Sequence, residues 1–320
     1  MGFISSCAQD SYRAARAMAP VPPKTLTLMA NQGMEPGAPI LMRAFKKEAE
    51  IEVWKQGRDG KYALLKTYPI CRWSGQLGPK IREGDRQAPE GFYEVTAAAM
   101  NPNSSLFLSF NIGFPNAYDR AHNRTGSHLM VHGACSSQGC FAMTDEAISE
   151  VYAVTREAFA AGQHSFQFQS YPFRMTPENL AKHRADPHIA FWKNLKEGSD
   201  LFEVSRQAPQ WSVARGRYAF ESDPAILADV AAKRALDERR EGELVAKGTP
   251  AIRLVYQDGG GHPTLRKLAL AAANNPSSAD VDARTRQSLG DISRPEALAE
   301  EPREIPVVIP PPAVTGTVRR

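Results

Sequence analysis

The sequence predicts a mainly β protein with flanking helices, of the α+β class. Short runs rich in β-branched and aromatic residues follow one another between residues 40 and 132, and helical spacing of apolar residues takes over only at Thr144. Hydrophobic residues make up 42% of the chain and charged residues 23%, which excludes a fibrous protein or a small disulfide-bonded scaffold. The net charge of +4 is not concentrated in a basic run, so we expect no nucleic-acid partner.

Residues 1–23 are expected to form a leader that tethers the folded part. The prolines at its end fix φ and remove backbone donors, which favours an extended arm. Near its start, residues 4–7 (Ile-Ser-Ser-Cys) resemble the end of a bacterial lipoprotein signal, in which the cysteine is lipidated. Lipid on Cys7 would be the only link to a membrane, because no apolar run reaches the roughly 18 residues of a spanning helix. The alternative is a leader with a cysteine there by chance.

A hairpin is predicted in the first half of the chain. The runs at 50–54 and 62–68 have the composition of strands, and Asp59-Gly60 between them supplies the positive φ that a tight turn needs. A short helix over 24–31 precedes the hairpin. Further strands are expected at 40–42, 91–95, 105–110 and 127–132.

Helices are predicted in the second half. Thr144 is a good N-cap with acidic residues in the following turn, and apolar residues recur at helical spacing up to Gly162. A second helix begins at Thr176, with Pro177 at its first position. A long exposed helix is expected over 223–247 and a strand over 251–256.

The chain divides by composition into four parts. From about residue 274 the apolar periodicity is lost and prolines accumulate, which predicts a disordered tail. The expected parts are the leader over 1–23, a main domain over 24–220, a helical and strand extension over 221–273 and the tail over 274–320.

The densest group of reactive side chains precedes the helix that begins at Thr144. Two histidines and two cysteines fall within the fourteen residues 127–140. A cysteine nucleophile needs an imidazole to hold it as a thiolate, and His132 could serve Cys140 in that way. Gly139 leaves room for a substrate carbonyl and lets backbone N–H groups turn toward an oxyanion. Cys140 is therefore a candidate nucleophile.

Other fates of these cysteines remain open. Cys135 and Cys140 have the spacing of half a zinc site, to which His128 and His132 could be added, but no second cysteine pair exists. A disulfide between Cys135 and Cys140 would switch a thiol enzyme off. The third alternative is a buried structural cysteine, which is what we expect of Cys71. We expect no metal and no cofactor.

The same stretch resembles the active-site signature of the L,D-transpeptidases of the YkuD type. That signature is His-Gly, a spacer and Ser/Thr-His-Gly-Cys; here His132-Gly133 is followed by residues 137–140, Ser-Gln-Gly-Cys. The spacer is short and Gln138 replaces a histidine, and both departures are similar to the YafK-like branch of the family. The run Phe-Ala-Met-Thr that leads to Asp145 agrees with that branch.

A second block agrees with the family. Residues 74–80 are similar to its glycine/lysine turn, and residues 84–93 to the segment that enters a core strand. The resemblance covers about residues 38–200 and implies a YkuD-like β-sandwich as the catalytic core of the main domain.

The resemblance implies a role for each residue of the signature. Cys140 would be the nucleophile and His132 the general base, with the Gly133 carbonyl orienting the imidazole. Ser137 is expected to bond the loop backbone. Gln138 stands where a histidine would lie near the substrate carboxylate, so that part of the family mechanism is changed here.

Four more residues are candidates for substrate contact. His128 is expected to be structural or to line the substrate site. The loop upstream of the site is polar, so its cations are either contacts for a stem-peptide carboxylate or solvated charges. These cations are Arg120 and Arg124, and Lys80 belongs to the same group of candidates.

The resemblance further implies an activity. Cys140 would attack a peptidoglycan stem peptide, form a thioester and pass the acyl group to an amine of another stem or of an outer-membrane protein. The alternative within this branch is a hydrolase that cuts the bond between diaminopimelate and a lipoprotein lysine. A different class is a cell-wall binding module, which would be expected to lack a nucleophile or a base. These functions imply a periplasmic protein, with or without a lipid anchor.

Overall fold

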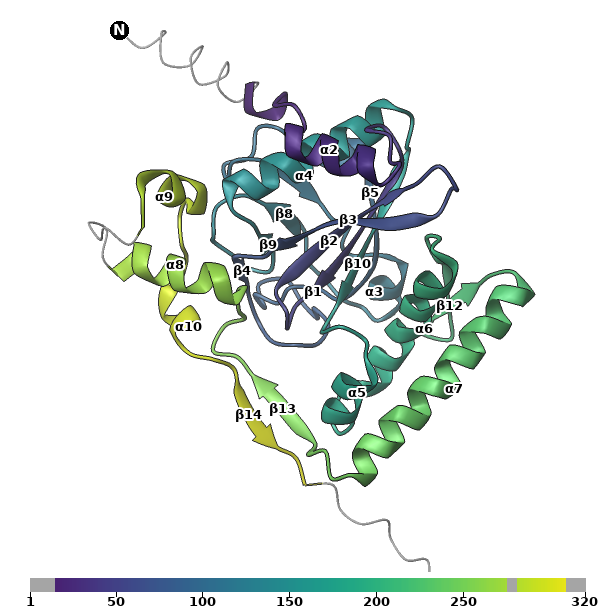
Figure 1. The fold of residues 1–320 in the computed structure, drawn as a ribbon. Coiled ribbons are helices and arrows are strands. Elements are labelled where there is room, and N and C mark those ends of the chain that lie inside the picture. The colour runs from purple at the N-terminus through teal and green to yellow at the C-terminus, as the bar shows by residue number, and fades with distance from the viewer. Residues whose placement is uncertain (1–14, 275–280, 309–320) are drawn as a thin grey trace, which may run out of the picture.

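Two five-stranded sheets form the centre of the computed structural model, which describes residues 15–274 and 281–308 (Figure 1). Their strand orders are β3-β2-β1-β10-β5 and β4-β9-β8-β7-β6. The first sheet contains β1 (Ile40–Phe45), β2 (Glu50–Gln56), β3 (Tyr62–Pro69), β5 (Gly91–Thr96) and β10 (Ser165–Tyr171). The second contains β4 (Arg72–Trp73), β6 (Met100–Asn101), β7 (Ser109–Asn111), β8 (Met130–His132) and β9 (Phe141–Ala142). With helices flanking both sheets, the α+β class expected from the sequence is confirmed.

The predicted hairpin is confirmed as well. β2 and β3 pair antiparallel, and the turn between them contains Gly60 at φ +74°. Glycine adopts this conformation without steric cost. β1 lies between β2 and β10 and is buried along its whole length. A strand covered on both faces has a continuous apolar run in place of alternation, which is the pattern at 40–42.

Aromatic side chains fill the space between the two sheets. Phe110 of β7 packs edge-to-face on Phe166 of β10, with 5.7 Å between the ring centroids. Phe141 of β9 lies 5.6 Å from Phe168 of β10 by the same measure. All four side chains are buried, and each burial stabilises the fold by roughly 1.5–3 kcal/mol. Phe141 directly follows Cys140, so this core fixes the strand that carries on from the candidate nucleophile.

Two helices lie side by side at the top of Figure 1, α2 (Pro23–Asn31) and α4 (Asp145–Ala160). α4 begins where the sequence predicts, because the Thr144 hydroxyl accepts a hydrogen bond from the backbone N–H of Ala147 at 3.2 Å. α4 follows β9 after a short link. Its N-terminus is therefore close to the segment that contains the reactive side chains.

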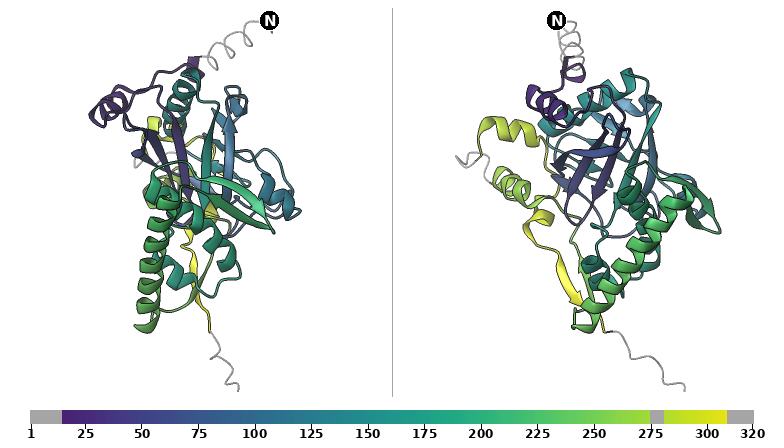
Figure 2. Two further views of the ribbon diagram at one scale, coloured as in Figure 1. Left: turned by 90° about the vertical axis from the view of Figure 1, so that its right-hand side faces the viewer. Right: turned by 45° about the vertical axis from the view of Figure 1, so that its right-hand side comes forward.

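The helix expected at Thr176 is divided in two. α5 (Pro177–His183) begins there, and α6 (Ile189–Ser205) follows after Pro187. Proline disfavours helical backbone in the residue before it, which explains the division. The long helix expected over 223–247 is α7 (Pro224–Ala246); it packs along α5 and α6 on one side of the molecule (Figures 1 and 2).

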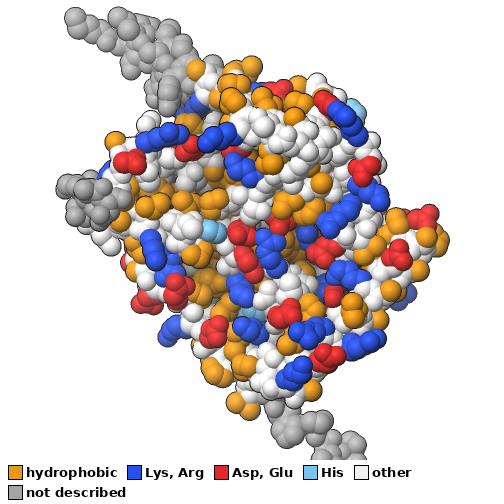
Figure 3. Space-filling view, in the orientation of Figure 1, with side chains coloured by type: hydrophobic (Ala, Val, Ile, Leu, Met, Phe, Trp, Pro, Cys, Tyr) orange, Lys and Arg blue, Asp and Glu red, His pale blue; other side chains and the backbone are white. Residues whose placement is uncertain are grey.

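Short elements and a mixed surface complete the described chain. Within it, no helix combines the length and the apolar composition that crossing a bilayer requires. Acidic and basic side chains are interspersed over the face shown in Figure 3. The short elements are η1 (Ala97–Ala99), α3 (Ala117–Ala121) and the two-stranded ribbon of β11 (Gln210–Ala214) and β12 (Arg217–Glu221).

The N-terminal arm is packed on the fold where it is described, although an extended tether was expected. Ala17 and Val21 are buried. Arg156 of α4 donates to the backbone carbonyls of Ala17 at 2.7 Å and Ala19 at 3.0 Å. The two apolar side chains and the carbonyls of the arm therefore find partners on the domain. Residues 1–14, and with them the expected lipid site at Cys7, lie outside the described residues.

The disorder expected for residues 274–320 is wrong for residues 281–308. Leu289 and Leu298 are only 1% exposed, because the short elements in this segment pack on the main domain. Each element spans too few residues to show a periodic pattern in the sequence. These elements are α9 (Ala283–Leu289), α10 (Pro295–Ala299) and β14 (Arg303–Pro306).

The C-terminal segment runs along the side of the molecule that carries β4 (Figure 1). It begins with β13 (Ile252–Val255), which β14 joins as an antiparallel partner, and α8 (Pro263–Asn274). An isolated bridge pairs Gly260 with Trp73 of β4. The rest of the expected tail, residues 275–280 and 309–320, lies outside the described residues.

Candidate active site

Cys140 lies immediately before β9 and is half-buried. It is the one free cysteine among the described residues. Its Sγ accepts a hydrogen bond from the backbone N–H of Met130 at 3.4 Å and donates toward the carbonyl of His128 at 3.7 Å. The thiol is therefore held against the backbone at the start of β8.

His132 ends β8, which lies next to β9, the strand that follows the candidate nucleophile. β8 and β9 are parallel, with Val131 opposite Phe141 and His132 opposite Ala142. Paired residues point to the same side, and side chains alternate along a strand. Phe141 faces the aromatic core, so His132 and Ala142 face away from it. Cys140, two residues before Ala142, lies at the edge of that same outer face.

Hydrogen bonding fixes the tautomer of His132. Its Nδ1 lies 2.6 Å from the carbonyl oxygen of Gly133. A carbonyl only accepts, so Nδ1 carries the proton and Nε2 keeps a free lone pair. Burial lowers the pKa of His132, and the bond to Gly133 opposes this in part. The imidazole is therefore neutral at neutral pH and can act as a base through Nε2.

The Cys140 side chain is a neutral thiol in this environment. Burial raises its pKa, and the Met130 N–H and the positive charge of Lys80 lower it in part. This differs from the thiolate expected from the sequence, because burial disfavours the charged thiolate more than the Met130 N–H and Lys80 favour it. A neutral thiol and a neutral imidazole can transfer a proton as the sulfur attacks a carbonyl.

The backbone after His132 turns in a space that has no room for a larger residue than glycine. A Cβ on Gly133 would lie 2.6 Å from Asp145 Oδ1 and 2.8 Å from the Cβ of Phe107. The same carboxylate accepts a hydrogen bond from the N–H of Ala134 at 2.8 Å. Burial raises the pKa of Asp145 to about 6. The first turn of α4 therefore holds the start of the segment that leads to Cys140.

Ser137 bonds the loop backbone, as expected. Its Oγ donates to the carbonyl of Cys140 at 2.8 Å. It also lies 3.0 Å from the Oγ of Ser74. Both serines are buried, so they support the backbone around the candidate nucleophile from inside the fold.

The backbone N–H of Gly139 bonds a serine, whereas the sequence suggested that it turns toward a substrate oxyanion. Its N–H donates to Ser74 Oγ at 2.6 Å, so it does not turn toward an oxyanion. Its φ is +115°, and a Cβ would lie 3.4 Å from the carbonyl oxygen of Gln87. Glycine is therefore needed for the turn itself. The side chain of Gln138 beside it is exposed.

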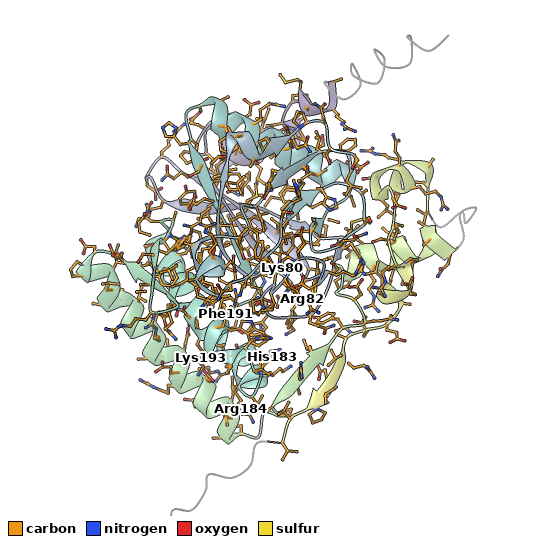
Figure 4. The ribbon with its side chains drawn as sticks, turned by 180° about the vertical axis from the view of Figure 1, so that it is seen from behind. Lys80, Arg82, His183, Arg184, Phe191 and Lys193 are labelled. Carbon is orange, nitrogen blue, oxygen red and sulfur yellow. A yellow bond between two sulfur atoms is a disulfide. The ribbon has the colours of Figure 1, made fainter. Side chains whose placement is uncertain are left out.

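The cations proposed for substrate contact are mostly engaged inside the fold. Lys80 is 3% exposed, forms an ion pair with Asp85 and lies within the body of the molecule (Figure 4). Arg124 is 8% exposed and pairs with Asp119 at 2.9 Å. Neither presents a free charge to a ligand. Arg120 is exposed, and one guanidinium nitrogen donates to a backbone carbonyl.

His128 contributes backbone rather than a buried side chain. It has a φ of +54°, its side chain is exposed, and its carbonyl accepts from the Cys140 thiol at 3.7 Å. Because the backbone is left-handed at this position, β8 begins only at Met130. Because the imidazole is exposed, His128 is not a buried structural residue. Its expected role in lining the substrate site stays a prediction.

Cys135 is bonded to Cys71 in a disulfide across 64 residues. This excludes the alternative of a disulfide between Cys135 and Cys140. Cys71 is buried, as expected, and its sulfur is bonded to Cys135. The disulfide also removes Cys135 as a zinc ligand. Cys140 is thereby left as a thiol, and the segment before it is tied to β4.

Two supporting residues were given no role from the sequence, Ser74 and Arg86. Arg86 donates to the carbonyl of Ser137 at 3.1 Å, and Ser74 bonds Gly139 as described above. Both belong to the second block of family resemblance, which was the available signal. Their partners lie more than fifty residues away, so spacing alone does not connect them.

The comparisons with known proteins agree with this architecture. Residues 46–160 match the YkuD family model, described as an L,D-transpeptidase catalytic domain. The "Putative L,D-transpeptidase YafK" of Escherichia coli strain K12 is 46% identical over 183 residues, which is 57% of this chain and 74% of that protein. The protein of the same name from Escherichia coli O157:H7 gives the same values. Among solved structures, the helical cell shape determining protein Pgp2 of Campylobacter jejuni aligns over 72% of this chain and 80% of its own, with 18% identity and a TM-score of 0.34, too low to carry an argument.

Proposed function

Because this chain belongs to the L,D-transpeptidase family with a YkuD catalytic domain, we propose that it is a cysteine acyltransferase acting on peptidoglycan stem peptides. The observation that carries the proposal is that His132 ends β8 while Cys140 directly precedes β9, the parallel strand next to it. The cysteine is free, and the histidine keeps its Nε2 lone pair because Nδ1 is bonded to Gly133.

The reaction would proceed in two halves through Cys140. As Sγ attacks the amide carbonyl at the L-centre of diaminopimelate, Nε2 of His132 takes the thiol proton. The tetrahedral intermediate collapses, the C–N bond breaks, and the imidazolium returns the proton to the amine of the departing D-alanine. An acceptor amine then attacks the thioester and loses a proton to His132. The C–S bond breaks as the new amide forms, and the imidazolium returns the proton to sulfur, which restores the thiol.

A hydrolase remains the alternative for the second half. If water replaced the acceptor amine, the same thioester would yield a free carboxylate. Applied to a stem joined to a lipoprotein lysine, that reaction would release the lipoprotein. The acceptor depends on which molecule enters the site, so the products decide between transfer and hydrolysis.

The disulfide supports a location outside the reducing cytosol. Disulfides persist in oxidising compartments such as the bacterial periplasm, and the Cys71–Cys135 bond is buried in the described fold. We therefore propose a periplasmic protein. A lipid on Cys7 would add a membrane anchor and is part of this proposal.

Mass spectrometry of muropeptides tests the proposed activity. The full chain is incubated with tetrapeptide muropeptides and with muropeptides joined through diaminopimelate to lysine. We expect cross-linked dimers and free D-alanine, with no product from Cys140→Ser. Cys7→Ser serves as the matched control, because it also removes a cysteine but not the one proposed as the nucleophile.

The other outcomes of this experiment contradict the transfer proposal. Cleavage of the lysine linkage with the tetrapeptides untouched would identify the hydrolase. No product from the wild-type chain would favour the binding module. Product from Cys140→Ser would exclude this cysteine as the nucleophile.

A further inference from the structure

The segment that leads to Cys140, residues 134–139 and here called the nucleophile loop, forms hydrogen bonds with residues outside the matched catalytic domain. The N–H of Cys135 donates to the carbonyl of Leu289 at 2.7 Å. The N–H of Ser137 donates to the Oγ of Ser293 at 3.0 Å. Both acceptors belong to the C-terminal segment, more than 120 residues beyond the end of the family match at residue 160.

The two backbones approach closely at a glycine. Gly290 has a φ of +60°, and a Cβ there would lie 2.8 Å from the Cβ and 3.0 Å from the Cα of Ala134. Contacts of that length exclude any larger residue. The C-terminal segment is therefore fitted against the nucleophile loop over residues 289–293.

A buried carboxylate joins this contact to the main domain. Asp258 is 5% exposed, and its Oδ2 accepts from Arg86 at 2.8 Å, from Arg294 at 2.9 Å and from Arg72 at 3.3 Å. Its Oδ1 accepts from the N–H of Gly75 at 3.2 Å. One carboxylate thus links β4, the loop after it and the C-terminal segment.

Arg86 carries this link to the nucleophile loop. The guanidinium nitrogen that bonds Asp258 also donates to the carbonyl of Ser137 at 3.1 Å. Ser137 in turn bonds the Cys140 carbonyl through its Oγ. Ser137 is therefore connected to the C-terminal segment in two ways. Its N–H bonds Ser293, and its carbonyl bonds Arg86, which also bonds Asp258.

The C-terminal segment also packs over the Cys71–Cys135 disulfide. Cys71, Cys135 and Leu289 form one buried apolar cluster, against which Leu265 and Leu268 of α8 pack. Leu289 is also the residue whose carbonyl accepts from the N–H of Cys135. The C-terminal helices therefore shield the covalent link between β4 and the nucleophile loop as well as holding the loop backbone.

We propose that Ser293 and Asp258 are positioning residues, through which the C-terminal segment holds the nucleophile loop and sets the orientation of Cys140. This rests on the proposed function only in taking Cys140 as the nucleophile. A small displacement of a reacting atom costs a large part of the rate. Loosening the loop should therefore slow acyl transfer while making the thiol easier for a small reagent to reach.

The test compares Ser293→Ala and Asp258→Asn in the full chain. Turnover is measured as kcat and KM with the stem-peptide substrate. The alkylation of Cys140 by iodoacetamide is followed across pH by mass spectrometry of its peptide. We expect kcat to fall by about tenfold with KM little changed, and alkylation at neutral pH to become at least about threefold faster. Both rates are measured well below the melting temperature of each variant, because unfolding would also slow turnover and expose the thiol.

Two control variants match these changes. Ser288→Ala removes a hydroxyl of the same segment that bonds the N–H of Glu146 in α4 at 3.2 Å, not the nucleophile loop. Asp237→Asn removes a carboxylate that pairs with Lys196 and Lys233, between α6 and α7. Melting temperatures of all four variants show how much stability each loses.

The proposal is overturned if Ser293→Ala matches Ser288→Ala in both kcat and alkylation rate. If Asp258→Asn does not fold, Ser293→Ala alone decides. Alkylation needs no substrate, so its outcome holds even if the chain turns over no stem peptide. A failure of the proposed function and a failure of this inference can therefore be told apart.

Discussion

The protonation of two side chains determines how the site would respond to pH. Burial raises the pKa of the Cys140 thiol and lowers that of the His132 imidazole. The two groups are therefore both neutral over a wide range around pH 7. Attack on a carbonyl then requires a proton transfer from sulfur to Nε2, not a preformed ion pair.

The first prediction concerns the acid side of the pH profile. A base works only when unprotonated, and the pKa of His132 is lowered, so kcat/KM should fall only below the ordinary histidine pKa of about 6.5. His132→Gln should lower kcat/KM by about 10²–10⁴-fold. Steady-state kinetics from pH 4 to 8 checks both statements. A loss of activity that begins at pH 7 or above on acidification would contradict a lowered pKa.

The second prediction concerns the pKa of the Cys140 thiol, which can be measured without a substrate. Because the pKa of Cys140 is raised, its alkylation by iodoacetamide should have a midpoint above the roughly 8.5 of an ordinary cysteine. A short cysteine peptide provides the reference. A midpoint at or below that of the peptide would contradict a raised pKa for Cys140.

At the scale of single elements, the sequence predicted the end of a strand or helix wherever a single residue determines that end. Gly60 and Thr144 predicted the hairpin turn and the start of α4, because each acts through its own backbone. The strand expected over 105–110 is shorter, since Phe107 has a φ of +65° and β7 begins only at Ser109. Nothing in the type of that residue indicates a left-handed conformation.

A buried ion pair connects the residue after β1 and the residue before β5, and its carboxylate also bonds α6. Lys46 and Glu90 are 2.9 Å apart and both side chains are fully buried. The other oxygen of Glu90 accepts from the indole N–H of Trp192 at 2.8 Å. Burial lowers the pKa of Lys46, against the opposing effect of Glu90. Removing the carboxylate charge would leave this lysine buried without its counter-charge.

We therefore predict that Glu90→Gln lowers the free energy of unfolding by about 3–5 kcal/mol. The control is Glu35→Gln, because Glu35 pairs with Arg58 at 3.4 Å while the two side chains are 69% and 80% exposed. That change should cost no more than about 1 kcal/mol. Urea unfolding measures both variants. Equal losses for the two would contradict a structural role for the buried pair.

For the whole molecule, the long-range contacts were the part that the sequence could not predict. The disulfide joins residues 64 positions apart, and four cysteines permit several pairings. The packing of residues 281–308 depends on a surface formed by β4 and the nucleophile loop, which exists only after the domain has folded. The catalytic signature was recognisable because its residues are adjacent in sequence, whereas Ser74, Arg86 and Asp258 reach it from three other segments.

The disulfide should stabilise the whole fold. Closing a loop of this length restricts the unfolded chain and stabilises a protein by about 2–4 kcal/mol. We predict a loss of that size in the free energy of unfolding for the double variant Cys71→Ser with Cys135→Ser. Urea unfolding with and without dithiothreitol checks it, because the reductant should weaken the wild type and leave the double variant unchanged. A reductant effect on the double variant would contradict this pairing.

The most direct test of the central claim is to trap the acyl group on the enzyme. The full chain is mixed with a tetrapeptide stem substrate without an acceptor, quenched in acid and analysed by intact mass and peptide mapping. We predict an added mass equal to the stem peptide without its terminal D-alanine, located on the peptide that contains Cys140 and absent from Cys140→Ser. D-alanine released with no adduct at Cys140, or an adduct at another residue, would contradict the assignment of Cys140 as the nucleophile.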